Sequence, residues 1–409
     1  MLKVFCFKRC KMSVKNDSRH TILASYGGYI TQAIVNNLLA LLLLIFRDRF
    51  GIPLEQLTLL VTINFLVQLA VDLLAAKYAD KIGWRRCIVA AHILAAAGIA
   101  GLAFLPKLMP PFAGLVVCVV LYAIGGGLIE VLVSPLVEAC PTDNKAGVMS
   151  LLHSFYCWGT VAVVVLSTLF LHFFGKDSWE LLALIWSIFP LVIAVYFTQV
   201  PIYSLVDEGE QLPLRKLCTV RGFWIFVLMI FAAGASEQAM SQWASAFAEE
   251  GLGITKTMGD LLGPCVFSVL MGLARVLYGK FSEKLDLNLF MFGCSVLCIG
   301  AYLLASLSAL PWLALVGCGL CGLSVGIMWP AVYSMASAAI PKGGAGMFAL
   351  LALSGDLGCS GGPTAVGLIS GAADGDMKLG LLWAVVFPAI MLIGNLLRHK
   401  GEKGEHSAK

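Results

Sequence analysis

Four ionisable side chains lie deep inside long apolar stretches of this 409-residue sequence. They are Glu130, His153, Glu237 and Asp356, and His92 is a fifth, weaker candidate. A charged side chain at the centre of a bilayer costs about 3 kcal/mol or more, so such residues are rare and mark proton, ion or substrate pathways. Carboxyl and imidazole groups both bind and release protons. The sequence therefore predicts proton coupling inside a membrane, with Glu130, His153 and Asp356 as its residues.

Glu130 and His153 are expected at similar depth. Glu130 lies twelve residues before a turn centred near Thr142, and His153 lies eleven residues after it. At a rise of 1.5 Å per residue, the two positions are level on adjacent antiparallel helices. We expect them to pair directly or through water and to form a proton site. A structural hydrogen bond that fixes this helical hairpin is the alternative.

Asp356 stands in a glycine-rich segment, residues 355–363, which ends in Pro363. Glycine allows close helix approach or local unwinding, and proline frees a backbone carbonyl. Ordinary helix packing is the alternative explanation for the glycines. Asp356 therefore suits either proton coupling or substrate binding.

A polar stripe follows one side of the apolar stretch at residues 222–247. It includes Glu237, Gln238 and Gln242, and residues three and four apart share a helix face. Such a stripe is typical of a cavity wall, and a stripe between packed helices is the alternative. Asn36 in the first apolar stretch corresponds to Gln238 in the register of an internal repeat. We therefore expect both halves of the chain to offer amides to one ligand.

Two tryptophans complete the predicted substrate site. Trp243 and Trp329 lie within apolar stretches, and Trp329 precedes Pro330. Amides, carboxylates and an indole ring suit a sugar, whose hydroxyls need donors and acceptors and whose C–H face stacks on a ring. They also suit an organic cation, which a carboxylate and cation–π contacts would hold.

These residues must be held by membrane-spanning helices. The chain is 59% hydrophobic and 13% charged, whereas soluble proteins carry about 25% charged residues. Its apolar stretches are long enough to cross a bilayer as helices, and the alternation of a barrel strand is absent. Twelve such stretches cover residues 20–46, 57–79, 86–105, 111–137, 146–174, 179–200, 222–247, 258–280, 287–308, 311–337, 345–371 and 377–397. The sequence predicts an all-α membrane protein.

Lysine and arginine predict the orientation. If the N-terminus is cytoplasmic, 21 of the 28 lysines and arginines fall on the cytoplasmic side and six on the other. Because positive residues stay inside, we expect both termini in the cytoplasm and a multi-pass protein of the plasma (inner) membrane. The net charge of +4 is then an insertion signal and no sign of nucleic-acid binding. Cys318 and Cys321 lie in an apolar helix without a second pair, so no metal site is expected.

A repeated segment divides the chain. Residues 72–81 and 275–284 match 203 positions apart, with one large mismatch, Asp72 against Arg275. Duplicated membrane chains usually build two bundles around a central site and act as transporters. The predicted units are an N-terminal bundle with its tail (residues 1–200), a cytoplasmic linker (201–221) and a C-terminal bundle with its tail (222–409).

The first copy of the repeat resembles a known signature. Ala76-Lys-Tyr-Ala-Asp-Lys-Ile-Gly83-Trp-Arg-Arg86 is similar to the loop 2–3 motif of the major facilitator superfamily, G-x-x-x-D-[RK]-x-G-x-[RK]. Ala76 replaces the first glycine, and Gly279 keeps it in the second half. The resemblance implies twelve transmembrane helices in two six-helix bundles related by a pseudo-two-fold axis, with alternating access to one cavity.

The same resemblance implies gates. In this family the loops lock the two bundles together at the cytoplasmic face when the protein is open outward. The gate residues would be Asp80, Arg85, Arg86, Glu283 and Lys284. Asp72 and Arg275 lie one turn deeper, where they either pair across the bundle interface or find local partners.

Together these features predict a secondary transporter and no enzyme, since Glu130 and His153 lack a nucleophile. Proton-coupled symport of a small polar solute such as a sugar is the favoured function, and the chain resembles the fucose and glucose proton symporter group. A proton antiporter that exports organic cations or drug-like compounds is the alternative, and a non-transporting substrate sensor is a further one. An organic-anion carrier is disfavoured. We expect a monomer in the lipid bilayer that binds a small-molecule substrate, needs no cofactor and binds no nucleic acid.

Overall fold

The computed structural model describes residues 17–52, 54–203, 212–244, 247, 263, 265–374 and 376–407. Part of the predicted linker, residues 204–211, lies outside the described residues. So do the connection between the seventh and eighth predicted spans, residues 248–257, and residues 258–262 at the start of the eighth. The described residues are mainly helical, and they contain no strand.

The first half of the chain follows the six predicted spans closely. Its helices are α1 (Ser18–Phe50), α2 (Leu54–Ile82), α3 (Trp84–Gly101), α4 (Leu105–Leu108), α5 (Pro111–Ala139), α6 (Lys145–Phe174) and α7 (Trp179–Gln199), with the 3-10 turn η3 (Lys176–Ser178) before α7. Local signals set the ends. Gly51 ends α1 with a φ of 65°, and the Asn144 side chain accepts from the Gly147 N–H to cap α6.

The second half contains two breaks that the sequence analysis did not predict. Its helices are α8 (Leu214–Leu217), α9 (Arg221–Ser241), α12 (Val266–Phe281), α13 (Leu287–Leu307), α14 (Pro311–Val325), α15 (Met328–Ala339), α16 (Gly344–Ala372), α17 (Met377–Trp383) and α18 (Val386–Ser407), with the turn η6 (Ser282–Lys284). The tenth expected span is split into α14 and α15, and the twelfth into α17 and α18.

Proline explains both breaks. A proline has no N–H to donate, and its ring clashes with the carbonyl four residues earlier. For Pro330 that carbonyl belongs to Gly326, directly between α14 and α15, and for Pro388 it belongs to Ala384, between α17 and α18. The break at Gly326 leaves a carbonyl free inside the bundle, and this carbonyl is used in the site described below.

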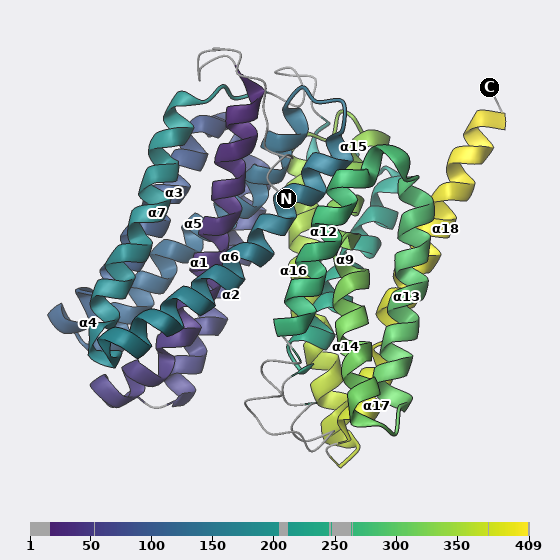
Figure 1. Ribbon diagram of the computed structural model, residues 1–409. Coiled ribbons are helices and arrows are strands. Elements are labelled where there is room, and N and C mark those ends of the chain that lie inside the picture. The colour runs from purple at the N-terminus through teal and green to yellow at the C-terminus, as the bar shows by residue number, and fades with distance from the viewer. Residues whose placement is uncertain are drawn as a thin grey trace.

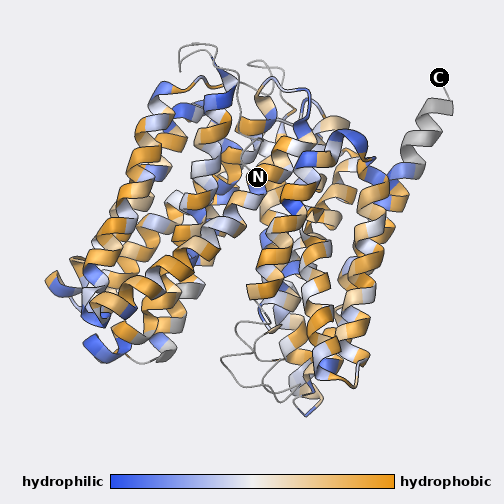
Figure 2. Ribbon diagram, viewed as in Figure 1, coloured by the Kyte–Doolittle hydropathy of each residue, from blue (hydrophilic) through white to orange (hydrophobic). Residues whose placement is uncertain are grey.

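The surface of the molecule suits a bilayer. Hydrophobic residues cover the sides of the helices, and hydrophilic residues gather at the two ends (Figure 2). Within the described residues, seven helical segments are individually long and apolar enough to cross a membrane. The helices α1, α2 and α16 fall outside that group, and they hold amide and carboxyl side chains of the central site.

The helices form two bundles, α1–α7 and α9–α18 (Figure 1). The most extensive packing between them is that of α2 on α16 and of α6 on α12, and α5 on α16 and α6 on α15 add to it. The bundles meet near the end where α6 begins and diverge toward the end that carries α4 and α17 (Figure 1). We call these the sealed end and the open end. The arrangement agrees with the predicted division into halves, and the boundaries at residues 200 and 222 stay a prediction.

Candidate functional site

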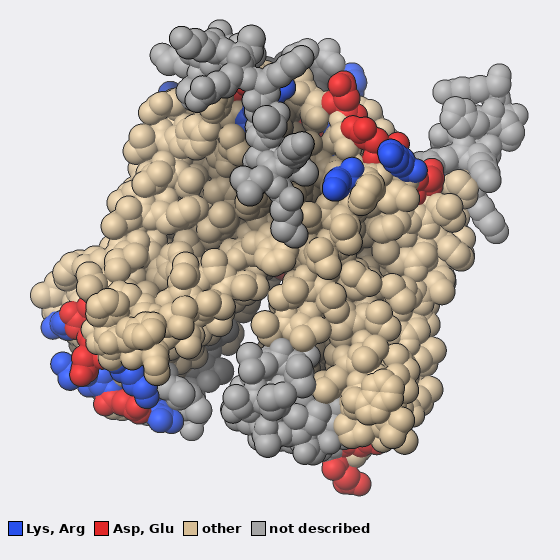
Figure 3. Space-filling model, in the orientation of Figure 1, with Lys and Arg blue, Asp and Glu red and all other residues tan. Residues whose placement is uncertain are grey.

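A cavity of about 760 Å³ lies between the two bundles. Most of the predicted substrate and proton residues line it: Asn36, Glu130, His153, Glu237, Gln238, Gln242, Trp329 and Asp356. Arg275 lines it as well. The space-filling view shows a notch between the halves at the open end (Figure 3). The cavity therefore gathers, from seven helices, residues that were selected one by one from the sequence.

Glu130 is held by a network of amides. The Gln32 Nε2 donates to Glu130 Oε2 at 2.9 Å and to Gln68 Oε1 at 3.2 Å. The Gln68 Nε2 in turn donates to Asn36 Oδ1 at 2.9 Å and to Asn64 Oδ1 at 3.0 Å. This network joins α1, α2 and α5. It connects the carboxyl group of Glu130 with the predicted substrate residue Asn36.

His153 belongs to a separate cluster. Its Nε2 lies 3.3 Å from the Tyr29 hydroxyl and 3.3 Å from the Ser134 hydroxyl, and these two hydroxyls are 2.9 Å apart. Within the described residues no hydrogen bond joins His153 to Glu130. A direct pair is not formed, because similar depth does not set the direction in which each side chain faces, and pairing through water stays a prediction. Ser134 lies one turn from Glu130 on α5, so the two clusters are neighbours without direct contact.

Arg275 connects both halves at the floor of the cavity. Its Nη2 lies 3.3 Å from Glu237 Oε2, and its Nε donates to the free carbonyl of Gly326 at 2.6 Å. Its Nη1 crosses to α6, where it donates to the His153 carbonyl at 3.1 Å and to Cys157 Sγ at 3.0 Å. Of the two open alternatives, its charge therefore takes a local partner, Glu237. Only 3% of Arg275 is exposed, and a buried charge needs such compensation.

Trp329 lies where a glycine makes room for it. A Cβ on Gly355 would collide with the Trp329 indole ring. Trp329 and Tyr333 meet edge to face at 6.2 Å, and Tyr333 lies 5.9 Å from the His153 ring. Trp243 is different, because its Nε1 donates to the Pro363 carbonyl at 2.9 Å and the residue does not line the cavity.

The predicted gate residues of the first half make contacts within that half. The Trp84 Nε1 donates to Asp80 Oδ1 at 2.8 Å. Arg85 donates to the carbonyls of Phe197, Thr198 and Val200, which end α7. Gly83 links α2 to α3 with a φ of 97°, a conformation that explains the glycine of the motif. Arg86, Glu283 and Lys284 are exposed at the sealed end. Their gating role stays a prediction.

Other residues join the halves at the sealed end. The Ser282 hydroxyl donates to Asn144 Oδ1 at 2.8 Å, and the Ser150 hydroxyl donates to the Arg275 carbonyl at 2.9 Å. Sequence reasoning missed Asn144 and Ser282. Ser282 lies inside the second copy of the repeat, which is the signal that would have found it.

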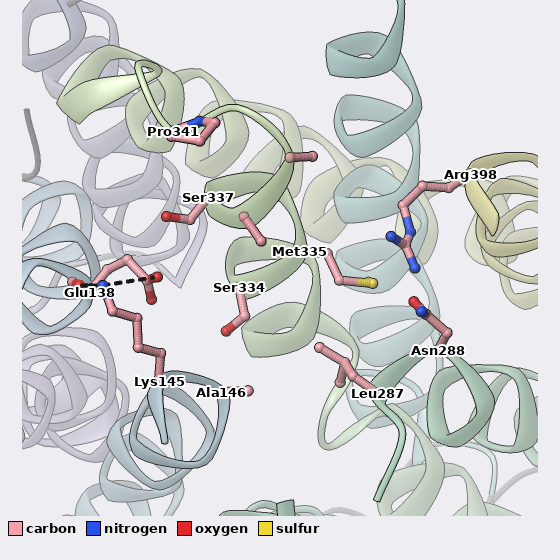
Figure 4. A pocket seen from close by; sticks show the side chains of 12 residues that line it. Glu138, Lys145, Ala146, Leu287, Asn288, Ser334, Met335, Ser337, Pro341 and Arg398 are labelled. Atoms are coloured by element: carbon pink, nitrogen blue, oxygen red, sulfur yellow. Dashed lines mark hydrogen bonds and ion pairs between the residues drawn. The ribbon is translucent and has the colours of Figure 1, made fainter. Parts of the chain in front are cut away.

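A second pocket, of about 580 Å³, lies between the halves at the sealed end. Glu138 and Lys145 face Ser334 and Ser337 of α15 across it (Figure 4). The Lys145 Nζ lies 3.9 Å from Glu138 Oε1 and donates to the Glu138 carbonyl at 2.6 Å. Polar side chains of both halves thus meet in this pocket. The contacts between the halves at the sealed end separate it from the main cavity.

The family model of the Major Facilitator Superfamily matches residues 26–363. The chain belongs to this superfamily. It is therefore a transporter and no enzyme, a multi-pass membrane protein with the twelve-helix fold of two related bundles. No curated protein sequence matches the chain closely enough to count as a relative.

Solved structures agree in fold. The transporter FucP in its outward conformation matches with a TM-score of 0.81 at 17% identity, covering 92% of this chain and 98% of that one. The N162A variant of FucP, the E. coli fucose:proton symporter, matches with a TM-score of 0.76 at 17% identity and the same coverage. The proton:xylose symporter XylE, bound to 6-bromo-6-deoxy-D-glucose, matches with a TM-score of 0.79 at 13% identity, covering 94% and 95%.

Proposed function

We propose that this transporter moves a small polar solute such as a sugar together with a proton. The observation that carries the proposal is the amide network that joins Glu130 to Asn36 beside the cavity. Glu130 has amide donors and no cation partner among the described residues. A carboxyl group in such surroundings is able to exist in both protonation states, whereas one beside a guanidinium stays ionised.

The network links protonation to substrate binding. As a carboxylate, Glu130 accepts from the Gln32 amide. A protonated Glu130 keeps one acceptor oxygen and gains an O–H donor, and the Gln32 Oε1, which has no partner among the described residues, accepts from that donor when the Gln32 amide turns. A turn of the Gln32 amide changes its hydrogen bond to Gln68. Gln68 in turn donates to the Asn36 oxygen in this conformation, so its hydrogen bond to Asn36 changes as well. Protonation of Glu130 thus changes the donors and acceptors that the cavity offers to a solute.

The opposite wall suits a sugar. Glu237, Gln238 and Gln242 supply acceptors and donors, and Trp329 supplies an aromatic face. The similarity in fold to symporters of fucose and xylose supports this substrate class. The predicted cytoplasmic termini place the open end outside the cell, where an importer receives its substrate. In this proposal the protein works as a monomer in the plasma membrane and needs no cofactor beyond the proton gradient.

The test is uptake into proteoliposomes under an imposed pH gradient. The panel contains pentoses, hexoses, deoxy sugars and organic cations, each with and without a protonophore. We expect one sugar to accumulate against its gradient and to acidify the lumen in step with its entry. Export of a cation in exchange for protons would contradict symport, and so would sugar movement that the protonophore leaves unchanged.

A further inference from the structure

Asp72 is a buried acid without a donor. It lies on α2, only 1% exposed, at a depth that the superfamily fold places within the membrane. Neither of its carboxylate oxygens accepts a hydrogen bond from the described residues. An ionised carboxylate left in this way would cost several kcal/mol, about as much as any uncompensated buried charge.

The group beside Asp72 is another carboxyl group. Asp356 on α16 is its interaction partner, and α2 packs directly on α16 across the boundary between the halves. Asp356 lines the cavity, whereas Asp72 lies behind it. Two carboxylates only accept hydrogen bonds, so these groups bond to each other only when one of them carries a proton.

The surroundings of the pair supply no compensating cation among the described residues. The titratable groups that face it from the packed elements are Glu130 of α5, Tyr29 of α1, Tyr333 of α15 and Cys359 of α16. Glu237 of α9 acts on Glu130. Arg275 is bound to Glu237, to the Gly326 carbonyl and to α6. A second negative charge at this place is therefore opposed by its neighbours.

Electrostatics favours one proton for the two acids. Two like charges on adjacent buried carboxyl groups repel each other strongly, because little water is present to screen them. A single proton replaces that repulsion with a strong hydrogen bond between acid and carboxylate, as in other paired carboxyl groups. We propose that Asp72 and Asp356 share one proton across the bundle interface and that this bond holds α2 against α16 in the present conformation.

The pair would be a second proton site, separate from Glu130. Water in the cavity delivers the proton to Asp356, which faces it. When the halves separate at the sealed end, Asp72 becomes hydrated and the proton leaves to water on that side. This sequence rests on the proposed proton-coupled transport, whereas the pairing itself is tested without any transported solute.

Infrared spectroscopy tests the shared proton directly. The purified protein is placed in lipid nanodiscs in an E130Q background, which removes any signal from Glu130. We expect a carbonyl band of a protonated carboxyl group that disappears on adding either D72N or D356N. The control D177N changes an exposed aspartate at the other end of the molecule and should leave the band in place. A band that survives both D72N and D356N overturns the proposal, as does its absence from the E130Q parent.

A distance measurement tests the effect on conformation. Spin labels on cysteines introduced at Lys81 and Lys284 report the separation of the halves at the sealed end, with the exposed Cys218 and Cys265 changed to serine. We expect a rise in pH to populate a longer distance in the parent protein. D72N should abolish this response, because an amide donates to Asp356 at every pH; D72E, which keeps the acid, should retain it.

The outcomes separate this inference from the proposed function. If D72N keeps the full pH response of the distance, the carboxyl pair does not hold α2 against α16. The proposal of proton-coupled uptake is unaffected by that result and is tested by the uptake assay. If uptake proves independent of protons while D72N still removes the pH response and the infrared band, the pair is real and the transport proposal fails.

Discussion

The two halves of this transporter hold their cavity glutamates in opposite surroundings. In the first half, Glu130 accepts from the uncharged amide of Gln32 at 2.9 Å. In the second half, Glu237 lies 3.3 Å from the guanidinium of Arg275. An amide satisfies a carboxylate without cancelling its charge, whereas a guanidinium favours the ionised form of its partner. The difference supports the proposal that the first half exchanges the proton, whereas the second half holds an ion pair tied to the seal.

Removing the arginine has the largest expected effect. In Arg275→Met, Glu237 keeps a buried charge without its partner and the Gly326 carbonyl loses its donor. Breaking a buried pair from one side costs about 3–5 kcal/mol. Melting curves in detergent should show a large loss of stability. Adding Glu237→Gln to Arg275→Met removes the orphan charge and should recover part of it; a double variant as unstable as the single one would contradict the role of the pair.

Gly355→Ala is expected to disturb the second half without touching any charge. The new methyl group collides with the Trp329 ring, and overpacking costs about 1–3 kcal/mol. The KM for the transported solute should rise by about tenfold, measured as initial uptake rates. Gly361→Ala is the matched control on the same helix, because a Cβ there meets only ordinary contacts at 3.7 Å. Equal KM values for the two variants would rule out a role for the Trp329 position.

The amide network of the first half should respond to Gln68→Leu. This change removes the donor to Asn36 and the acceptor for Gln32, each hydrogen bond being worth about 1 kcal/mol. We expect about a tenfold rise in KM together with a weaker dependence of KM on pH. Gln56→Leu, on the exposed part of the same helix, serves as the control. A change in KM with an unaltered pH dependence would separate the network from the proton.

The smallest effect is expected at the sealed end. Ser282→Ala removes the hydrogen bond to Asn144, which contributes about 1 kcal/mol. The balance should shift about fivefold toward opening at this end. Labelling of a cysteine introduced at Ala146, which lines the second pocket, measures that shift. If its labelling rate stays equal to that of a Ser308→Ala control, the Asn144–Ser282 contact is no latch.

Much of the fold could be predicted because it depends on local composition. Within the described residues, each long apolar stretch contains a helix or a pair of helices, since a bilayer admits few other arrangements. The breaks before Pro330 and Pro388 were not predicted, and nothing in the sequence indicated that Arg275 would donate to the carbonyl freed at Gly326. A proline by itself does not predict a break, since Pro135, Pro190 and Pro363 lie inside continuous helices.

Most of the predicted substrate and proton residues line the cavity, but the sequence did not indicate which of them form hydrogen bonds with one another. Counting residues gave the depth of Glu130 and His153, but the rotation of each helix decides which neighbours they meet. Asn64 and Gln68 were overlooked, although with Asp72 they stand four residues apart on one face of α2. Asp72 was interpreted as a gate residue through its place in the repeat. Its buried contact with Asp356 depends on how the two halves pack.

The central claim is that Glu130 carries the coupled proton, and Glu130→Gln tests it most directly. Two assays are compared in the same proteoliposomes, namely uphill accumulation driven by a pH gradient and exchange of labelled for unlabelled solute without a gradient. The account predicts that accumulation is lost while exchange continues, because the amide keeps the contact to the network but binds no proton. Glu180→Gln, a half-buried change outside the cavity that removes only the charge paired with Lys107, should preserve both. Uphill accumulation that survives in Glu130→Gln would contradict the account.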